Sequence, residues 1–172
     1  MRNAPSGFTL LEVMIVIALM SIVFSLAVPS LMDARSNQQV DSVQRSLLSA
    51  MNSARSMAIS QGQSISLCAS SDGQHCDGVW SGWLVFQGAV PASNVPVLGL
   101  SQGSTEQIPV SASGDRATWR ATGAALDSLT LSLCPPEAQQ RRQVTLSLIG
   151  RPRGSLDLDG DRVHEIPSGA CP

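Results

Sequence analysis

The sequence Gly7-Phe8-Thr9-Leu10-Leu11-Glu12 and the apolar run Val13–Val28 that follows it decide the fold of this chain. From Phe8 to Val28 the only charged residue is Glu12. At a rise of about 1.5 Å per residue, a helix of this length covers the roughly 30 Å hydrocarbon core of a bilayer. We therefore expect a transmembrane helix over Phe8–Pro29.

The segment before this helix, Met1–Gly7, is short and polar and carries one positive charge, Arg2. A secretory signal peptide would place its small-residue cleavage site after the apolar run, and cleavage there would remove the run. Here the small residue, Gly7, precedes the run. We therefore expect the mature protein to keep its apolar helix.

This stretch resembles the amino-terminal motif of type IV pilins and type II secretion pseudopilins. The resemblance implies that a prepilin peptidase cleaves the leader, residues 1–7, after Gly7 and methylates the new amino terminus at Phe8. It also implies that Glu12 registers neighbouring subunits in a filament and that Pro29 kinks the helix where it leaves the membrane. The alternative is an ordinary membrane anchor whose Glu12 reaches the interface, but such an anchor does not need this motif.

The position of Glu12 supports the resemblance on physical grounds. A carboxylate inside a bilayer costs about 2.5–3.5 kcal/mol on insertion scales, and such residues are candidates for a function by default. Glu12 lies four residues from the expected new amino terminus at Phe8. The terminal ammonium of a neighbouring subunit is a natural partner, because pairing relieves the cost of both charges.

The rest of the chain has the length and composition of one globular domain with a real core. About 140 residues follow the apolar run, and the whole chain is 43% apolar and 14% charged. The formal net charge is −2, and loss of Arg2 with the leader makes it −3. This balance excludes a field over the whole protein that attracts nucleic acid or an anionic surface, but it allows a local basic patch.

Four cysteines suit an exported domain with two disulfides, for which three pairings are possible. Cys68 and Cys76 bracket a turn-rich loop, so we expect a local bridge there, which leaves Cys134 to pair with Cys171. A metal site that uses His75 is the alternative. It is disfavoured, because the spacings do not match a Cys-x-x-Cys zinc arrangement. No cofactor or metal is expected.

The periodicity after Pro29 predicts an amphipathic helix followed by a β-rich domain. Apolar residues recur at spacings of three and four in the predicted helix, residues 30–62, which Gly62 closes: Val40, Val43, Leu47, Met51, Ala54 and Ala58. From residue 63 to 172 the period is two, with glycines and prolines between runs. The candidate strands begin at Ile65, Val79, Val95, Gln107, Ala117, Leu129 and Val144. The fold class is therefore α+β, a long amino-terminal helix packed on an antiparallel sheet, as in type IV pilins.

Several segments together are similar to the GspH/FimT family of minor pilins and pseudopilins, the group that includes FimU. They are Ala54–Ala58, the strands ending at Cys68 and Cys134, Gly82–Phe86, and Gly150-Arg151-Pro152-Arg153. The family implies a single-pass protein of the bacterial inner membrane with a periplasmic domain, which then joins a filament of other pilins or pseudopilins.

Gly150-Arg151-Pro152-Arg153 also resembles a Gly-Arg-x-Arg motif that contributes to binding of double-stranded DNA in FimT-type pilins during natural transformation. Arginines at i and i+2 of an extended chain point to one side, about 6–7 Å apart, and guanidinium groups bind phosphate well. Asp157, Asp159 and Asp161 follow closely and oppose a polyanion. Arg141 and Arg142 lie about 30 Å away if the strand is straight. A contact of Arg151 and Arg153 with another subunit is the competing interpretation.

Other residues offer little chemistry. The two histidines, His75 and His164, have no nucleophile at a recognised spacing, so no enzyme activity is expected. Acidic residues at 157, 159 and 161 fit a calcium loop in part, but the glycine falls at the fourth position rather than the sixth. A hairpin turn at Asp-Gly is the simpler interpretation. Two classes of function remain: an assembly subunit of a type IV pilus or type II secretion pseudopilus, and a DNA-binding minor pilin.

Overall fold

The computed structural model describes the backbone of residues 9–89, 97–101, 108–135, 141–157, 164–166 and 169–171, and the side chains of these residues except 26–34, 36, 100 and 101. The processing residues Gly7 and Phe8 lie outside the described residues, as does the predicted acidic loop beyond Asp157. The chain divides into two compact units, Met1–Gln38 and Gln39–Pro172.

One helix, α1 (Leu10–Gln61), runs through both predicted segments, 8–29 and 30–62, and ends one residue before Gly62. It begins at a capped turn, because the Thr9 hydroxyl accepts a hydrogen bond from the Glu12 N–H at 3.3 Å. The backbone is helical through Pro29, whose side chain is not described, so the predicted kink stays a prediction. Apolar side chains of the first part are exposed, including Leu10, Ile17 and Phe24.

Among the described residues, no helix is both long enough and apolar enough to cross a membrane.

The part of α1 in the second unit buries the predicted stripe. The six side chains are at most 5% exposed: Val40, Val43, Leu47, Met51, Ala54 and Ala58. The helix ends at Gln61, and Gly62 follows with φ +64°, the left-handed conformation that commonly ends a helix. The helix therefore ends where the sequence predicts, and its apolar face forms one side of the core.

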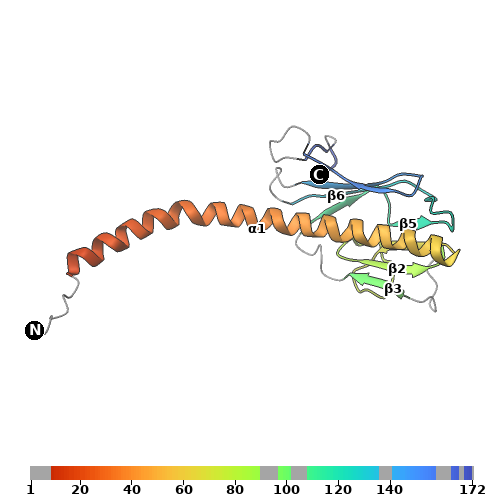
Figure 1. The fold of residues 1–172 in the computed structure, drawn as a ribbon, viewed down its shortest axis with the longest axis horizontal. Coiled ribbons are helices and arrows are strands. Elements are labelled where there is room, and N and C mark those ends of the chain that lie inside the picture. The colour runs from red at the N-terminus through yellow and green to blue at the C-terminus, as the bar shows by residue number, and fades with distance from the viewer. Residues whose placement is uncertain are drawn as a thin grey trace, which may run out of the picture. The chain divides into compact units, whose positions relative to one another are not determined.

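In the described part of the chain, eight strands form two four-stranded antiparallel sheets, several of whose strands are labelled in Figure 1. The first sheet has the order β3-β2-β1-β5 and the second has the order β4-β6-β7-β8. The strands are β1 (Ile65–Ala69), β2 (Trp83–Gln87), β3 (Val97–Ser101), β4 (Val110–Ala112), β5 (Arg116–Trp119), β6 (Leu129–Leu133), β7 (Arg142–Leu146) and β8 (Pro152–Gly154). The predicted α+β class is confirmed, with the strands divided between two sheets rather than joined in one.

A single large core joins α1 to both sheets. Its strand members come from β1, β2 and β5 on one side and from β6 and β7 on the other. The largest fully buried side chain is Trp119, at the end of β5. Every buried apolar residue belongs to residues 40–146 of the second unit, so a fragment that begins at Asp33 retains the whole described core.

Two disulfides close the described part of the domain. Cys68 is bonded to Cys76 with a Cα–Cα distance of 5.7 Å, and Cys134 to Cys171 with a distance of 5.6 Å. These are the pairs expected from the sequence. The first bridge stabilises a loop beside β1, and the second joins the end of β6 to a segment 37 residues further on.

Candidate functional site

The two motif arginines lie on a hairpin at the edge of the second sheet. After β7 the chain turns at Ser147–Gly150, where the Gly150 N–H donates to the Ser147 carbonyl at 2.8 Å, and returns as β8. In the register of this pair Arg153 lies opposite Thr145. Arg151 and Arg153 are exposed and Pro152 between them is half-buried, as expected for an extended chain that points both arginines to one side.

The hairpin turn is held against the domain at Gly150. The Trp119 indole N–H, fully buried, donates to the Gly150 carbonyl at 3.0 Å. Gly150 has φ +79°, and a Cβ at this position would lie 1.9 Å from the Gly123 carbonyl oxygen. That same oxygen accepts a hydrogen bond from Arg55 of α1 at 3.0 Å. Packing therefore requires a glycine at this position of the motif. The contacts of Gly150 also fix the position of the backbone directly before Arg151.

The other end of β8 is held by polar contacts to α1 and β7. The Ser155 hydroxyl accepts the Gln143 N–H at 2.9 Å and lies 3.0 Å from Nδ1 of His164. Gln44, a buried polar residue of α1, donates to the Gln143 carbonyl at 3.0 Å. Gly154 lets the strand approach this amide closely, because an added Cβ would lie 2.8 Å from its nitrogen. The two arginines are thus displayed on a segment that is fixed at both ends.

Arg142 does not join the motif, although it lies closer than a straight strand implies. The predicted separation of about 30 Å is wrong, because the chain turns between β7 and β8. The Arg142 side chain is 5% exposed, and its Nε donates to Asp41 of α1 at 2.8 Å. This ion pair, which the sequence did not reveal, connects the start of β7 to the helix. Because the Arg142 guanidinium is paired and buried, it does not contribute to binding of a ligand at the motif.

The motif arginines themselves have free charges. Within the part of the chain that the structure describes, neither Arg151 nor Arg153 forms an ion pair. Both are exposed, so a phosphate or a carboxylate of another molecule can reach them. Arginine binds either group with two parallel hydrogen bonds.

Glu12 is an exposed acid in the first turn of α1. It occupies the third helical position after the Thr9 cap, where a negative charge is favourable to the helix dipole. Its side chain has no partner among the described residues.

The loop closed by the Cys68–Cys76 disulfide is organised by two aspartates. His75 lies 2.8 Å from Asp72, and this contact, with the backbone N–H groups of Gln74 and His75, holds the pKa of Asp72 well below its ordinary value. The hydroxyl of Ser71 and the N–H of Val79 lower the pKa of Asp77 in the same way. His75 is thus engaged by Asp72. No group of three metal-ligating side chains occurs in the described ranges.

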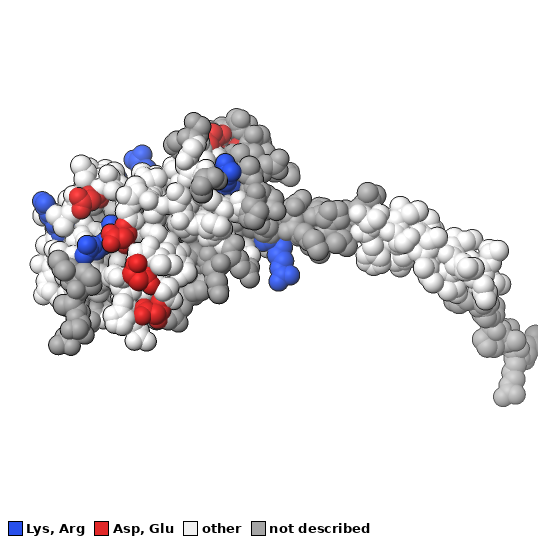
Figure 2. All heavy atoms as spheres, turned by 180° about the vertical axis from the view of Figure 1, so that it is seen from behind, with Lys and Arg blue, Asp and Glu red and all other residues white. Residues whose placement is uncertain are grey.

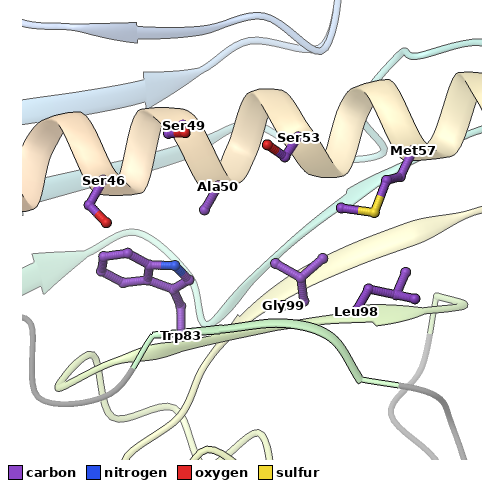
Figure 3. A pocket seen from close by; sticks show the side chains of 9 residues that line it. Ser46, Ser49, Ala50, Ser53, Met57, Trp83, Leu98 and Gly99 are labelled. Carbon is purple, nitrogen blue, oxygen red and sulfur yellow. The ribbon is translucent and has the colours of Figure 1, made fainter.

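A groove of about 500 Å³ lies between α1 and strands β2 and β3 (Figure 3). Small side chains of the helix face the aromatic and aliphatic side chains of the strands across it. The lining residues are Ser46, Ser49, Ala50, Ser53, Met57, Trp83, Val85, Leu98 and Gly99. None of them is titratable, so the groove offers no acid or base for catalysis.

Comparisons with known proteins agree with this structure. The model of the family "Type II transport protein GspH" matches residues 44–150, and that of the "Prokaryotic N-terminal methylation motif" matches residues 2–28. No curated protein matches the chain. Two crystal structures of the type IV minor pilin FimU of Pseudomonas aeruginosa (strain PAO1) share the fold, each with a TM-score of 0.54 over 67% of this chain. They are 22% and 21% identical to it, and the match covers 92% and 87% of their chains.

The two family matches do not overlap: one covers residues 2–28, and the other covers the last part of α1 and strands β1 to β7. The GspH match extends over more than half of the chain and ends at Gly150, directly before Arg151. The matching family and the solved neighbours are pilins, which are structural proteins and not enzymes. The chain belongs to the GspH family, and it is a pilin-like protein of the type IV pilus and type II secretion group.

Proposed function

We propose that the protein is a minor subunit that acts in assembly or initiation of a type IV pilus or a type II secretion pseudopilus, near the filament tip. Before assembly, residues 8–29 anchor it in the inner membrane and the domain lies in the periplasm. The observation that carries the proposal is the continuity of α1. One helix holds Glu12 in its first turn and buries the side chains of Val40, Met51 and Ala58 in the core of the second unit, so a single helix connects the assembly segment to the domain.

Processing by the prepilin peptidase follows from this proposal. The peptidase cleaves between Gly7 and Phe8 and methylates Phe8. Mass spectrometry of the protein from the native host is expected to find chains that begin at methylated Phe8. Mature chains that still carry residues 1–7, or that lack residues 13–28, would contradict the assignment.

Changing Glu12 to Ala is expected to leave membrane insertion intact, because it removes the cost of a charge in the bilayer. Incorporation into the filament should fall, because the amino terminus of the neighbouring subunit loses its partner. Glu12→Gln keeps the size of the side chain and removes its charge, so it separates the effect of charge from that of packing. It should lower incorporation into the filament as much as Glu12→Ala does. The measurement is the ratio of the protein in sheared filaments to that in membranes. An unchanged ratio for both variants would rule out registration by this charge.

Deletion of the gene with three readouts identifies the machine. Loss of surface pili indicates a pilus, loss of exoprotein secretion indicates a pseudopilus, and loss of transformation alone indicates DNA uptake. Normal results in all three assays would contradict the assembly function.

DNA uptake is the second candidate function, and the display of Arg151 and Arg153 favours it. The two guanidinium groups are exposed on one side of a fixed strand, without ion pairs among the described residues, which is a suitable geometry for phosphates of duplex DNA. Pro152 limits the conformations of the segment and lowers the entropy cost of binding. Because phosphate contacts carry no base information, this binding is independent of sequence.

A fragment that begins at Asp33 provides the test of DNA binding. It should bind unrelated duplexes with similar, weak affinity that falls steeply with salt. Arg151→Gln with Arg153→Gln should reduce the salt slope by roughly two and leave the melting temperature nearly unchanged. Arg116→Gln, on β5 of the other sheet, removes an arginine away from β8 and should keep more of the slope. Equal slopes for the double variant and Arg116→Gln, or no binding by the wild-type fragment, would contradict the DNA function.

A further inference from the structure

The second sheet has one face in the core and an opposite face made of polar side chains. Leu131 of β6 and its partner Val144 of β7 are fully buried in the core. Because successive side chains of a strand point to opposite faces, the residues between the buried ones form the outer face. The four strands contain no acidic residue. We call this outer face the hydroxyl face, and its members are Ser111, Ser113, Thr130, Ser132, Gln143, Thr145 and Arg153.

One row of the hydroxyl face runs across the sheet and ends at Arg153. Thr130 pairs with Thr145, and Thr145 pairs with Arg153. On the other side Ser113, directly after β4, donates its N–H to the Thr130 carbonyl, and its hydroxyl accepts the Thr130 N–H, both at 2.9 Å. Neighbouring strands lie about 4.8 Å apart, so the row from Ser113 to Arg153 is about 14 Å long. Arg151, two residues before Arg153, lies beside the end of this row.

The threonines of the row have hydroxyl groups that are available to a ligand. Thr145 and Arg153 are exposed, and Thr130 is half-buried. In the part of the chain that the structure describes, neither threonine hydroxyl has a hydrogen-bond partner, and Arg153 forms no ion pair. A hydroxyl donates one hydrogen bond and accepts others. Ser132, in the next row, is only 3% exposed, so the accessible part of the hydroxyl face is this row.

A row of this composition is better suited to a phosphate backbone than to another protein. Serine is depleted at protein interfaces, which are enriched in aromatic side chains, and the row contains none. In protein–DNA complexes half to two-thirds of the hydrogen bonds go to phosphate and sugar, and serine, threonine and arginine are among their donors. The row is also long enough to reach phosphates on both sides of a minor groove, which is about 6 Å wide.

The positive charge that the domain offers to a polyanion is small. The chain has a formal net charge of −2. Figure 2 shows one side of the molecule, on which basic side chains are separated by uncharged or acidic surface. Arg151 and Arg153 are therefore not part of a large basic field. Uncharged donors beside them add affinity, because a hydrogen bond to a charged acceptor is stronger than one between neutral groups.

We propose that the hydroxyl face binds the phosphate backbone of duplex DNA, with Thr130 and Thr145 as phosphate ligands beside Arg151 and Arg153. The inference rests on the proposed DNA function and extends its site from the motif across the sheet. The core that joins α1 to β6 and β7 lies on the opposite face. Contact with DNA therefore leaves the helix free for assembly with other pilins.

The salt dependence of binding distinguishes a hydroxyl contact from an arginine contact. The full-length protein in an uncharged detergent is titrated with a fluorescent duplex at several salt concentrations. Thr145→Val keeps the shape of the side chain and removes one donor, so it should weaken binding about fivefold at every salt concentration. The salt slope should stay unchanged, because a hydroxyl neutralises no phosphate and releases no counterion. Thr130→Val with Thr145→Val should weaken binding further at the same slope.

Two control variants accompany these changes. Thr145→Ser keeps the hydroxyl and should bind as tightly as the wild type. Ser53→Ala removes a hydroxyl of α1 that lies beside β2 and β3 of the other sheet, and it should also bind as the wild type does. Valine is a favourable residue in a strand, so the melting temperature of Thr145→Val should stay close to that of the wild type.

The outcomes separate this inference from the proposed function. Wild-type affinity of Thr145→Val, together with a lower slope for Arg151→Gln with Arg153→Gln, would overturn the hydroxyl contacts and leave DNA binding at the motif. A changed slope of Thr145→Val would also overturn them, because the valine would then act by displacing an arginine. No binding by the wild-type protein would remove both. If Thr145→Val lowers recovery in filaments and leaves DNA binding unchanged, the face contacts another subunit and the inference is wrong.

Discussion

Gly150→Ala is expected to lower the free energy of unfolding of the fragment that begins at Asp33 by about 3–5 kcal/mol. The left-handed φ of +79° costs an alanine about 1–3 kcal/mol, and the added Cβ would meet the Gly123 carbonyl oxygen at 1.9 Å. Relief requires the two turns to separate, which also breaks the Trp119 hydrogen bond to Gly150. For a domain of this size the loss corresponds to a melting temperature about 10–20 °C lower.

Gly62→Ala provides a matched control for this experiment. Gly62 has φ +64°, but nothing lies within 4 Å of a Cβ added there. Its cost is therefore backbone strain alone, about 1 kcal/mol. Thermal unfolding of both variants separates the strain from the collision. Equal melting temperatures would show that Gly150 does not pack against the Gly123 carbonyl as it does in the structure. The account of how the turn before Arg151 is held in place would then be wrong.

Asp41→Asn is expected to destabilise the domain by about 3 kcal/mol, because it leaves the Arg142 guanidinium without a counter-charge. The Arg142 side chain is 5% exposed and that of Asp41 36%. The carboxylate can therefore reach water when it is alone, whereas the guanidinium cannot. The cost falls on the buried partner, so removal of the acid should harm the fold more than removal of the base.

A double change tests this account. Asp41→Asn with Arg142→Met replaces the ion pair by apolar volume, which is often neutral in a buried position, so stability should return to within about 1 kcal/mol of wild type. Asp115→Asn, an exposed aspartate, is the control and should change stability by no more than about 0.5 kcal/mol. Chemical denaturation gives all three values. A double variant less stable than Asp41→Asn would show that the unpaired charge of Arg142 is not the cause of the destabilisation by the single change.

The parts of the fold that depend on local pattern were predictable from the sequence. The stripe from Val40 to Ala58 has a helical period, and each of its members is buried. Strands β1 and β6 lie where apolar and polar residues alternate. The length of α1 and its end before Gly62 also follow from the pattern, because both depend on neighbours in the chain.

The parts that depend on distant contacts were not predictable. Strand β8 contains Pro152 and Gly154, which are poor strand residues, yet it pairs with β7 and packs against α1 where Gly154 lies close to Gln44. The predicted strand from Val79 begins only at Trp83, since Asp77 binds the Val79 N–H and Trp80 donates to the Gly114 carbonyl. No local pattern indicates these partners.

The candidate site shows the same division. The spacing of Arg151 and Arg153 predicts that an extended chain displays both, and in the structure both are exposed with Pro152 half-buried between them. The support of the motif by Trp119 and Gly123 joins residues 27–31 positions away from Gly150, and the sequence contains no signal for it. The burial of Arg142 likewise depends on Asp41, 101 residues earlier.

The spacing of the two disulfides sets an order of maturation for a chain that is exported from its amino-terminal end. Cys68 and Cys76 are 8 residues apart, so this bridge can form as soon as one short loop has left the translocation channel. Cys134 must wait for Cys171, 37 residues later, and until then β6 has no covalent link to the segment that follows β8. If the domain is exported as proposed, a chain that stalls before Cys171 emerges would carry the Cys68–Cys76 bridge and an unpaired Cys134.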